Sequence, residues 1–265
     1  MFFRLSDWQL ALVIFAIVFG VTLLGLLLGI YLRRHSETLR DPFGVLQAAL
    51  LGLVGLILAF GLTLAVGRYE ARRAAVVDDA NAIGTTYLRA QMLSEPVRSR
   101  SLALLVHYTD ASIRLSHSIP GSPAQRRVIA VENGQQRSLW RLAGQELNQA
   151  PIATGPRLYI DSLNDMIDSQ TVRVSALNNR VPGAVLALEV LGAAAALGLL
   201  AVYLAILGRG VVSVLIAATL ITLLLLVTFD LDRPTRGLIR VPTGPLVALR
   251  ATMALPPAAA GAPRG

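Results

Sequence analysis

Four long apolar runs constrain the fold of this chain more than any other feature. They cover residues 8–32, 43–67, 183–207 and 211–229. Each run has about the 20 residues that an α-helix needs to cross roughly 30 Å of hydrocarbon. Because the apolar residues are continuous rather than alternating, the runs are typical of helices and not of strands. The sequence therefore predicts an all-α protein whose transmembrane part is a four-span helical bundle.

Composition supports a membrane protein and excludes several other classes. Charged residues make up 15% of the chain and hydrophobic residues 54%, whereas soluble domains carry about 25% charged residues. The absence of cysteine excludes disulfides, thiolate metal sites and cysteine nucleophiles. The net charge of +8 comes with basic residues that are all arginine. We assign these arginines to the flanks of the spans rather than to nucleic-acid binding.

The stretch between the second and third runs predicts a separate helical domain. We expect transmembrane helices in residues 1–67 and 183–232, and a cytosolic helical domain in residues 68–182. Residues 233–265 form a cytosolic C-terminal segment whose low-complexity end is expected to be disordered. Residues 68–92 contain no proline, so the second span is expected to continue beyond the membrane as one helix.

Further helices are expected within the large segment. Their predicted ranges are residues 96–117, 124–149 and 157–179. The second of these contains Asn133 and Gly134, which predict an interruption or a weak point there. Gly208 and Gly210 flank the short connection between the last two spans, which predicts a tight antiparallel hairpin.

The distribution of arginine predicts the orientation in the membrane. With four spans, both termini and the large segment share one side, which carries ten arginines near the membrane: Arg4, Arg68, Arg72, Arg73, Arg173, Arg180, Arg233, Arg236, Arg240 and Arg250. The other side carries Arg33, Arg34, Arg40 and Arg209. The positive-inside rule then places the termini and the large segment in the cytoplasm. Around the first span alone, the arginines favour the opposite orientation. We expect a multi-pass protein of the bacterial inner membrane.

Glu189 is the one acid well inside a span. Ionisable groups within a membrane are costly and are functional candidates by default. Glu189 lies only six residues after Gly183, about 9 Å along a helix. A structural role near the interface, paired with an arginine, is therefore the alternative.

The second span has two faces of interest. A stripe of small residues at helical spacing consists of Gly44, Ala48, Gly52, Gly55 and Ala59. Such a stripe allows helices to pack closely, either within the subunit or between subunits around a pore. The neighbouring face carries Gln47, Leu51, Val54 and Leu58. We consider these four residues candidates for a pore lining, since apolar rings gate pores by dewetting.

Arginines follow the second span directly. Arg68 and Arg72 either anchor the span or form an electropositive ring that attracts anions at a pore mouth. Two acidic clusters also stand near arginines, and they consist of Asp161, Asp165, Asp168, Asp230 and Asp232. Oxygen ligands suit calcium or magnesium, but neither cluster has the spacing of a calcium loop. Pairing with arginine is the favoured role, and no metal site is predicted.

Motifs that carry catalysis are missing from the sequence. It contains no glycine-rich phosphate loop, no zinc-binding His-Glu-x-x-His and no Gly-x-Ser-x-Gly. The three histidines are not spaced as a metal pair. We therefore expect no enzyme and no cofactor.

Several motifs together resemble the bestrophin-like domain family of bacterial membrane proteins. They cover residues 68–73, 79–90, 163–168 and 230–240, and the resemblance extends over roughly residues 43–249. It implies the plan of bestrophins, which are pentameric ion channels with four spans and cytosolic termini. In that plan the second span lines the pore, and a helical cytosolic region follows it.

The sequence also departs from bestrophins. Beyond Phe43, the second span has Phe60 as its one aromatic residue, where the bestrophin neck is aromatic. No dense acidic run follows the fourth span, so the resemblance does not extend to a calcium clasp.

The resulting functional hypothesis is a homo-oligomeric ion channel, with the lipid bilayer, further copies of the chain and small inorganic ions as partners. The resemblance implies a pentamer. The alternative is a non-conducting scaffold or sensor that docks a partner through its cytosolic helices. A third hypothesis, proton-coupled transport, depends on Glu189 alone.

Overall fold

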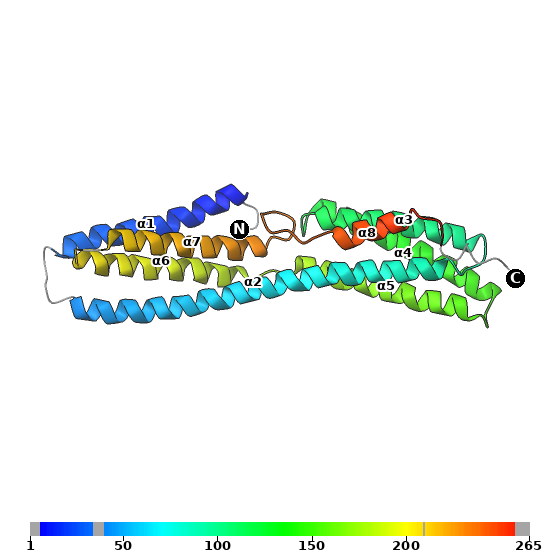
Figure 1. The fold of residues 1–265 in the computed structure, drawn as a ribbon, viewed down its shortest axis with the longest axis horizontal. Helices are drawn as coiled ribbons and strands as arrows, with labels where there is room; N and C mark the ends of the chain where they lie inside the picture. Colours follow the sequence, from blue (N-terminus) through cyan, green and yellow to red (C-terminus); the bar gives the residue numbers. More distant parts are fainter. Residues whose placement is uncertain (1–5, 34–39, 209, 258–265) are drawn as a thin grey trace. The chain divides into compact units, whose positions relative to one another are not determined.

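The computed structural model describes residues 6–33, 40–208 and 210–257, and these residues form helices and no strands (Figure 1). The low-complexity end predicted to be disordered lies largely outside the described residues, from position 258 onward. In chain order the helices are α1 (Asp7–Arg33), α2 (Arg40–Ala90), α3 (Val97–His117), α4 (Pro123–Gln149), α5 (Thr154–Asn178), α6 (Gly183–Ile206), α7 (Val211–Leu231) and α8 (Gly244–Thr252).

The chain divides into two compact units. Unit 1 comprises Met1–Tyr69 and Arg180–Ile239, and unit 2 comprises Glu70–Asn179 and Arg240–Gly265. Helix α2 contributes to both, because its 51 residues continue from the second apolar run into the polar segment. Among the described residues, four helical stretches are long and apolar enough to cross a membrane. The all-helical class and the four candidate spans are therefore confirmed.

Unit 1 is built around a close contact between α1 and α6. A Cβ added at Gly29 would lie 2.5 Å from the carbonyl oxygen of Val202 and 2.6 Å from the Cβ of Ala205. A Cβ at Gly25 would collide with the backbone of Gly198. The two helix backbones approach this closely because glycine has no side chain, which is the usual way for helices to associate in lipid.

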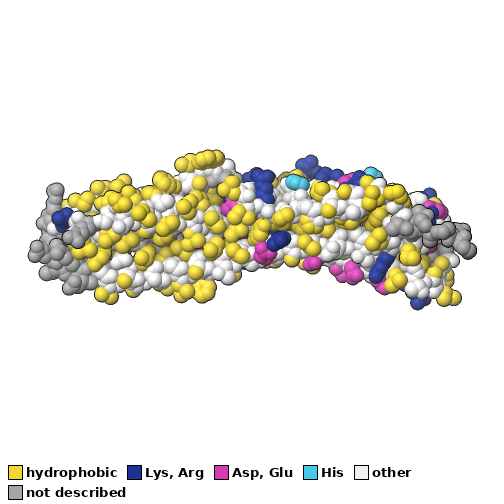
Figure 2. Space-filling model, in the orientation of Figure 1, with side chains coloured by type: hydrophobic (Ala, Val, Ile, Leu, Met, Phe, Trp, Pro, Cys, Tyr) yellow, Lys and Arg dark blue, Asp and Glu magenta, His cyan; other side chains and the backbone are white. Residues whose placement is uncertain are grey.

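In unit 1, α2 packs against α6 along one narrow stripe. Val54 and Leu58 are each only 4% exposed and belong to the core of this unit. The remaining faces of α2 in this unit are exposed, and Figure 2 shows hydrophobic side chains over the surface of the apolar helices. A helix that is apolar all round and exposed on most of its surface suits a lipid or subunit environment.

Unit 2 is a bundle of the polar helices with its own core. Tyr108, Leu139, Leu163 and Met166 are fully buried there. Helix α4 begins at Pro123, where the Ser122 hydroxyl caps it by accepting a hydrogen bond from the backbone N–H of Gln125. The interruption predicted at Gly134 is wrong, since α4 is continuous there. One glycine costs a helix only about 1 kcal/mol, and α4 also packs against α3 and α5.

Helix α8 belongs to unit 2 and packs against α3. The Arg250 guanidinium lies 2.7 Å from the Asp110 carboxylate, and the Tyr87 hydroxyl donates a hydrogen bond to the carbonyl of Met253. The segment after the fourth span is therefore folded as far as these residues.

Candidate functional site

The membrane part of α2 is the candidate site, and its contact with α6 determines which face is free. A Cβ at Gly44 would be 3.2 Å from the Tyr203 ring, and a Cβ at Gly192 would be 3.4 Å from Val54. The two helices thus pack side by side in antiparallel directions. The predicted pore-lining residues Val54 and Leu58 fill this contact, while Leu51 and Gln47 are half-buried beside it.

These positions bear directly on the predicted pore face. A side chain packed into the subunit's own core cannot also project into a lumen outside it, so burial argues against a lining role for Val54 and Leu58. At about 3.6 residues per turn, the opposite face of α2 carries Val45, Gly52, Leu56 and Thr63, all of them exposed. A uniformly apolar helix has no sequence signal that tells its two sides apart.

The predicted small-residue stripe lies mostly on the surface. Ala48, Gly52, Gly55 and Ala59 are exposed, and a Cβ added at Gly52 or Gly55 would meet no heavy atom within 4 Å. Gly44 differs, because it lies at the contact with α6. Within the subunit, close glycine packing belongs instead to Gly25 of α1 and its partner on α6, a pair that the sequence did not single out.

The two predicted pore-mouth arginines have different surroundings. Arg72 is buried in unit 2, where its guanidinium donates hydrogen bonds to the carbonyls of Ala176 (3.2 Å) and Asn179 (2.7 Å). These carbonyls lie at the C-terminal end of α5, whose partial negative charge a cation stabilises. Arg68 is half-buried in unit 1. Arg72 therefore caps a helix, and a pore-mouth charge would have to come from Arg68.

Glu189 lies on α6 at the contact with α2. Its side chain is 1% exposed, and neither carboxylate oxygen has a hydrogen-bond partner among the described residues. The carboxylate lies directly against Gly61 of α2, where any Cβ would collide with it. Gly61 thus provides the space that this acid occupies. The predicted arginine partner of Glu189 is not found in the described part of the chain.

The acidic clusters do not form a metal site in the described residues. Asp161, Asp165 and Asp168 are exposed on α5. Asp230 accepts hydrogen bonds from the backbone N–H groups of Leu238 (3.0 Å) and Ile239 (2.8 Å). Asp232 is fully buried and accepts one from the N–H of Val181 (3.1 Å).

Asp230 and Asp232 therefore have structural roles at the end of α7. Asp230 holds the chain that follows this helix, and Asp232 ties the end of α7 to the segment before α6.

Unit 2 contains a buried charge network that the sequence analysis missed. The Arg173 guanidinium of α5 lies 2.6 Å from the Asp79 carboxylate of α2, and both side chains are almost fully buried. The Ser112 hydroxyl of α3 donates to the same carboxylate at 2.8 Å, and Arg173 also donates to the Ser112 carbonyl at 2.8 Å. Asp79 belongs to one of the motifs that resemble the bestrophin-like family. Its partner Arg173 is 94 residues away, so the sequence spacing does not indicate that the two residues pair.

Glu132 of α4 lies in the same interior. Its carboxylate accepts a hydrogen bond from the Gln170 amide at 3.0 Å, and its second oxygen has no partner among the described residues. Burial raises the pKa of Glu132 from 4.5 to about 7. The hydrogen bond from Gln170 and the charges of Arg173 and Arg114 lower this pKa, and the charge of Asp79 raises it further.

Comparison with known proteins assigns the fold to a family. The Bestrophin-like domain matches residues 12–246, which is most of the chain. The chain belongs to the bestrophin-like family. The resemblance noted in the sequence motifs is thereby confirmed. No curated protein matches this bestrophin-like chain at a significant level.

Solved structures agree with the family assignment at the level of fold. A crystal structure of a bacterial bestrophin homolog from Klebsiella pneumoniae matches the bestrophin-like chain with a TM-score of 0.64 and 16% sequence identity. The match covers 89% of this chain and 95% of that one. Two single-substitution variants of that homolog match with TM-scores of 0.63 and 17% identity, covering 89% and 90% of this chain and 95% and 96% of theirs. At this identity the likeness shows the fold alone.

Proposed function

We propose that this bestrophin-like chain is the subunit of a homo-oligomeric ion channel whose pore is lined by the outward face of α2. The observation that carries the proposal is the exposure of this face in the single chain. Leu56 is 54% exposed, whereas Leu58, two residues away on the same helix, is 4% exposed. An apolar face of this length needs lipid, another subunit or a gated pore beside it.

In this proposal, one face of α2 lines the lumen and the neighbouring face contacts the next subunit. Val45, Gly52, Leu56 and Thr63 face the lumen, and Leu56 provides an apolar ring that gates by dewetting. The small residues Ala48, Gly55 and Ala59 lie beside them and contact α2 of the next subunit, since small side chains allow close helix approach. By analogy with bestrophins, the assembly is a pentamer.

The orientation follows the arginine distribution. Both termini and unit 2 lie in the cytoplasm, and the protein resides in the bacterial inner membrane. Arg68 then provides positive charge at the cytoplasmic end of the lumen, where it favours anions.

Ion flux from proteoliposomes tests the proposal. Purified protein is expected to release a trapped inorganic anion, and Leu56→Ala is expected to increase the flux by widening and wetting the constriction. Leu58→Ala is the matched control, because it removes the same side chain from the subunit core and should lower stability rather than change conduction. Absence of flux from folded oligomers would favour the non-conducting scaffold instead.

Glu189 favours a second candidate, proton-coupled transport. A buried carboxyl group without partners in a span is typical of a proton site. In that case Glu189→Gln should abolish pH-dependent uptake into vesicles while leaving the protein folded. Uptake that is unaltered by this substitution would remove the transporter from consideration.

A further inference from the structure

The exposed charges of unit 2 are separated by sign between its helices. Figure 1 shows α2 and α5 on one side of this unit and α3 and α4 on the other. Helix α5 exposes an acidic row on one face, at the helical spacing of i, i+4 and i+7, which consists of Asp161, Asp165 and Asp168. Helix α4 exposes a basic row, which consists of Arg127, Arg137 and Arg141. The two rows therefore lie on different sides of one unit.

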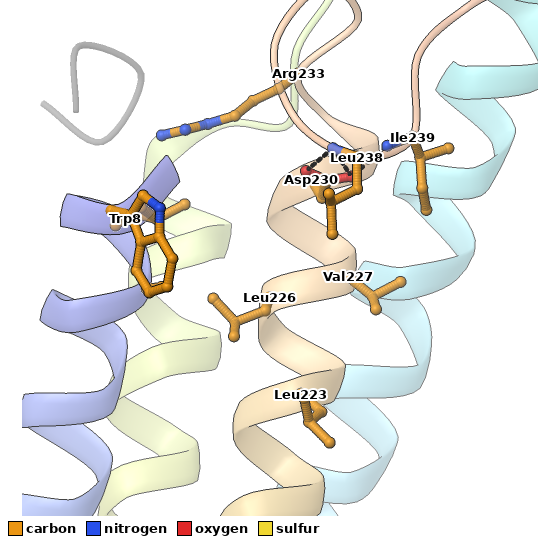
Figure 3. Close-up of a pocket in the computed structure, with 10 residues that line it drawn as sticks. Trp8, Leu223, Leu226, Val227, Asp230, Arg233, Leu238 and Ile239 are labelled. Carbon is orange, nitrogen blue, oxygen red and sulfur yellow. Dashed lines mark hydrogen bonds between the residues drawn. The ribbon is translucent and has the colours of Figure 1, made fainter. Parts of the chain in front are cut away.

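Neither row is neutralised within the chain. In the described residues, the three acids of the acidic row form no salt bridge, and neither do the three arginines of the basic row. Asp230, beside the apolar groove between α1 and α7, shows the contrast, because its carboxylate accepts hydrogen bonds from the backbone N–H groups of Leu238 and Ile239 (Figure 3). Like charges at helical spacing repel each other. Both rows therefore favour an oppositely charged surface outside the chain.

Apolar side chains accompany both rows. Leu158 is 42% exposed and Val172 is 60% exposed, and their spacing puts them on the same face of α5 as the acidic row. Val131 is 47% exposed, four residues after the first arginine of the basic row on α4. Each face therefore offers apolar area for burial together with charge of one sign for orientation.

The two rows also lie at matching heights along the bundle. Helices α4 and α5 are joined by a short connection and run in opposite directions, and the Gln170 amide of α5 donates a hydrogen bond to Glu132 of α4. Counted from this bond, Arg137 lies five residues further along α4, and Asp165 lies five residues back along α5. Each is therefore about 7.5 Å from the bond in the same direction, at 1.5 Å per residue.

We propose that unit 2 binds a second copy of the chain, with the acidic row of one copy against the basic row of the next. The inference rests on the homo-oligomer of the proposed function and names a surface that this oligomer uses. Because each copy carries both signs on different helices, the contact is head-to-tail, and repeated contacts of this kind close into a ring. In a ring whose axis runs along the bundle, rotation keeps every residue at its height, so Arg137 pairs with Asp165 of the next subunit.

Charge favours this arrangement over two simpler ones. A two-fold dimer brings the same face of both copies together, so it would place acids against acids or arginines against arginines. A nucleic acid would contact the basic row of α4 alone and leave the acidic row of α5 without a partner. A second copy of the chain complements both rows at once.

Cross-linking between copies of the full-length protein in proteoliposomes tests the proposal. The chain has no cysteine, and Val131 and Val172 are exposed residues on the two faces, close in height to the bond between α4 and α5. Val131→Cys and Val172→Cys chains are co-expressed with different affinity tags and treated with a short bismaleimide. A cross-linked dimer that carries both tags is expected. Either variant expressed alone should give no dimer, since identical faces do not meet in a head-to-tail ring.

Charge reversal makes the test specific for the two rows. Asp165→Arg, added to the Val172→Cys chain, should lower the yield of the mixed dimer about tenfold, because it places like charges opposite each other. Arg137→Asp, added to the Val131→Cys chain, should then restore the yield. A yield that does not respond to these reversals would overturn the proposal, as would a dimer from either cysteine variant alone.

The mass of the detergent-solubilised particle separates this inference from the proposed function. An oligomeric particle that gives no mixed dimer would overturn the interface and leave the homo-oligomer intact. A monomeric particle would contradict the homo-oligomer itself, and the interface with it.

Discussion

The two units of this chain hold their interiors together by different means. Unit 2 buries an ion pair, Asp79 with Arg173, and surrounds it with serine hydrogen bonds. Unit 1 buries the acid Glu189 with no partner in the described residues, and its closest contact is between the glycine-lined backbones of α1 and α6. In lipid, burial of apolar side chains drives no association between helices, so close packing takes its place.

The difference predicts which substitutions each unit tolerates. The stability of unit 2 should fall when one buried charge is removed and should depend on pH. The stability of unit 1 should fall when a larger side chain is placed on α1. If these changes lowered the stability of both units equally, this description of their interiors would be wrong.

The largest effect is expected from Asp79→Ala. It leaves the Arg173 guanidinium buried without its counter-charge, which costs about 3–5 kcal/mol. The melting temperature of unit 2 in detergent should fall by roughly 10–20 °C. Asp161→Ala on the exposed surface of α5 is the control and should have little effect. A melting temperature unchanged by Asp79→Ala would contradict a network that holds unit 2 together.

A smaller effect is expected from the protonation of Glu132. Its pKa is about 7 in the folded protein and 4.5 when unfolded, so the folded state binds the proton more tightly. Stability should therefore fall as the pH rises from 4.5 to 7 and stay low above that, by roughly 3 kcal/mol. Thermal unfolding as a function of pH measures this loss of stability. Glu132→Gln should remove the decrease between pH 4.5 and 7.

Glu95 supplies a control of opposite sign. Its hydrogen bonds from Ser99 and Arg98 lower the pKa of this exposed carboxyl, so its contribution is present above pH 4.5 and lost as the pH falls. Glu95→Gln should therefore leave the loss of stability between pH 4.5 and 7 in place. A pH profile of Glu132→Gln identical to that of the parent would refute the assignment to Glu132.

The smallest of the three effects is expected in unit 1. Gly29→Val places a side chain against the backbone of Val202, and overpacking of this kind costs about 1–3 kcal/mol. Gly20→Val on the same helix is the matched control, because a Cβ there meets no heavy atom within 4 Å. Both variants carry the same helix-propensity cost, so the difference in their melting temperatures reports the contact itself. Equal melting temperatures would show that α1 and α6 do not need this close approach.

Some features of this structure follow from sequence patterns, and others depend on contacts between residues that are far apart in the chain. The apolar runs predict the four spans because the thickness of a membrane fixes the length of a helix. The outward face of α2 was not predictable, because Val54 and Leu56 are equally apolar and only the position of α6 distinguishes them. The role of Arg72 was missed for a similar reason, since the carbonyls that it caps are more than 100 residues away.

The central claim, that the outward face of α2 lines a pore, is tested most directly by cysteine accessibility. The chain contains no cysteine, so Leu56→Cys and Leu58→Cys each introduce a single reactive thiol. Ion current across a planar bilayer is recorded before and after a membrane-impermeant methanethiosulfonate reagent. The account predicts that the current through Leu56→Cys is blocked and that through Leu58→Cys is unchanged. Block of Leu58→Cys with an insensitive Leu56→Cys would contradict it.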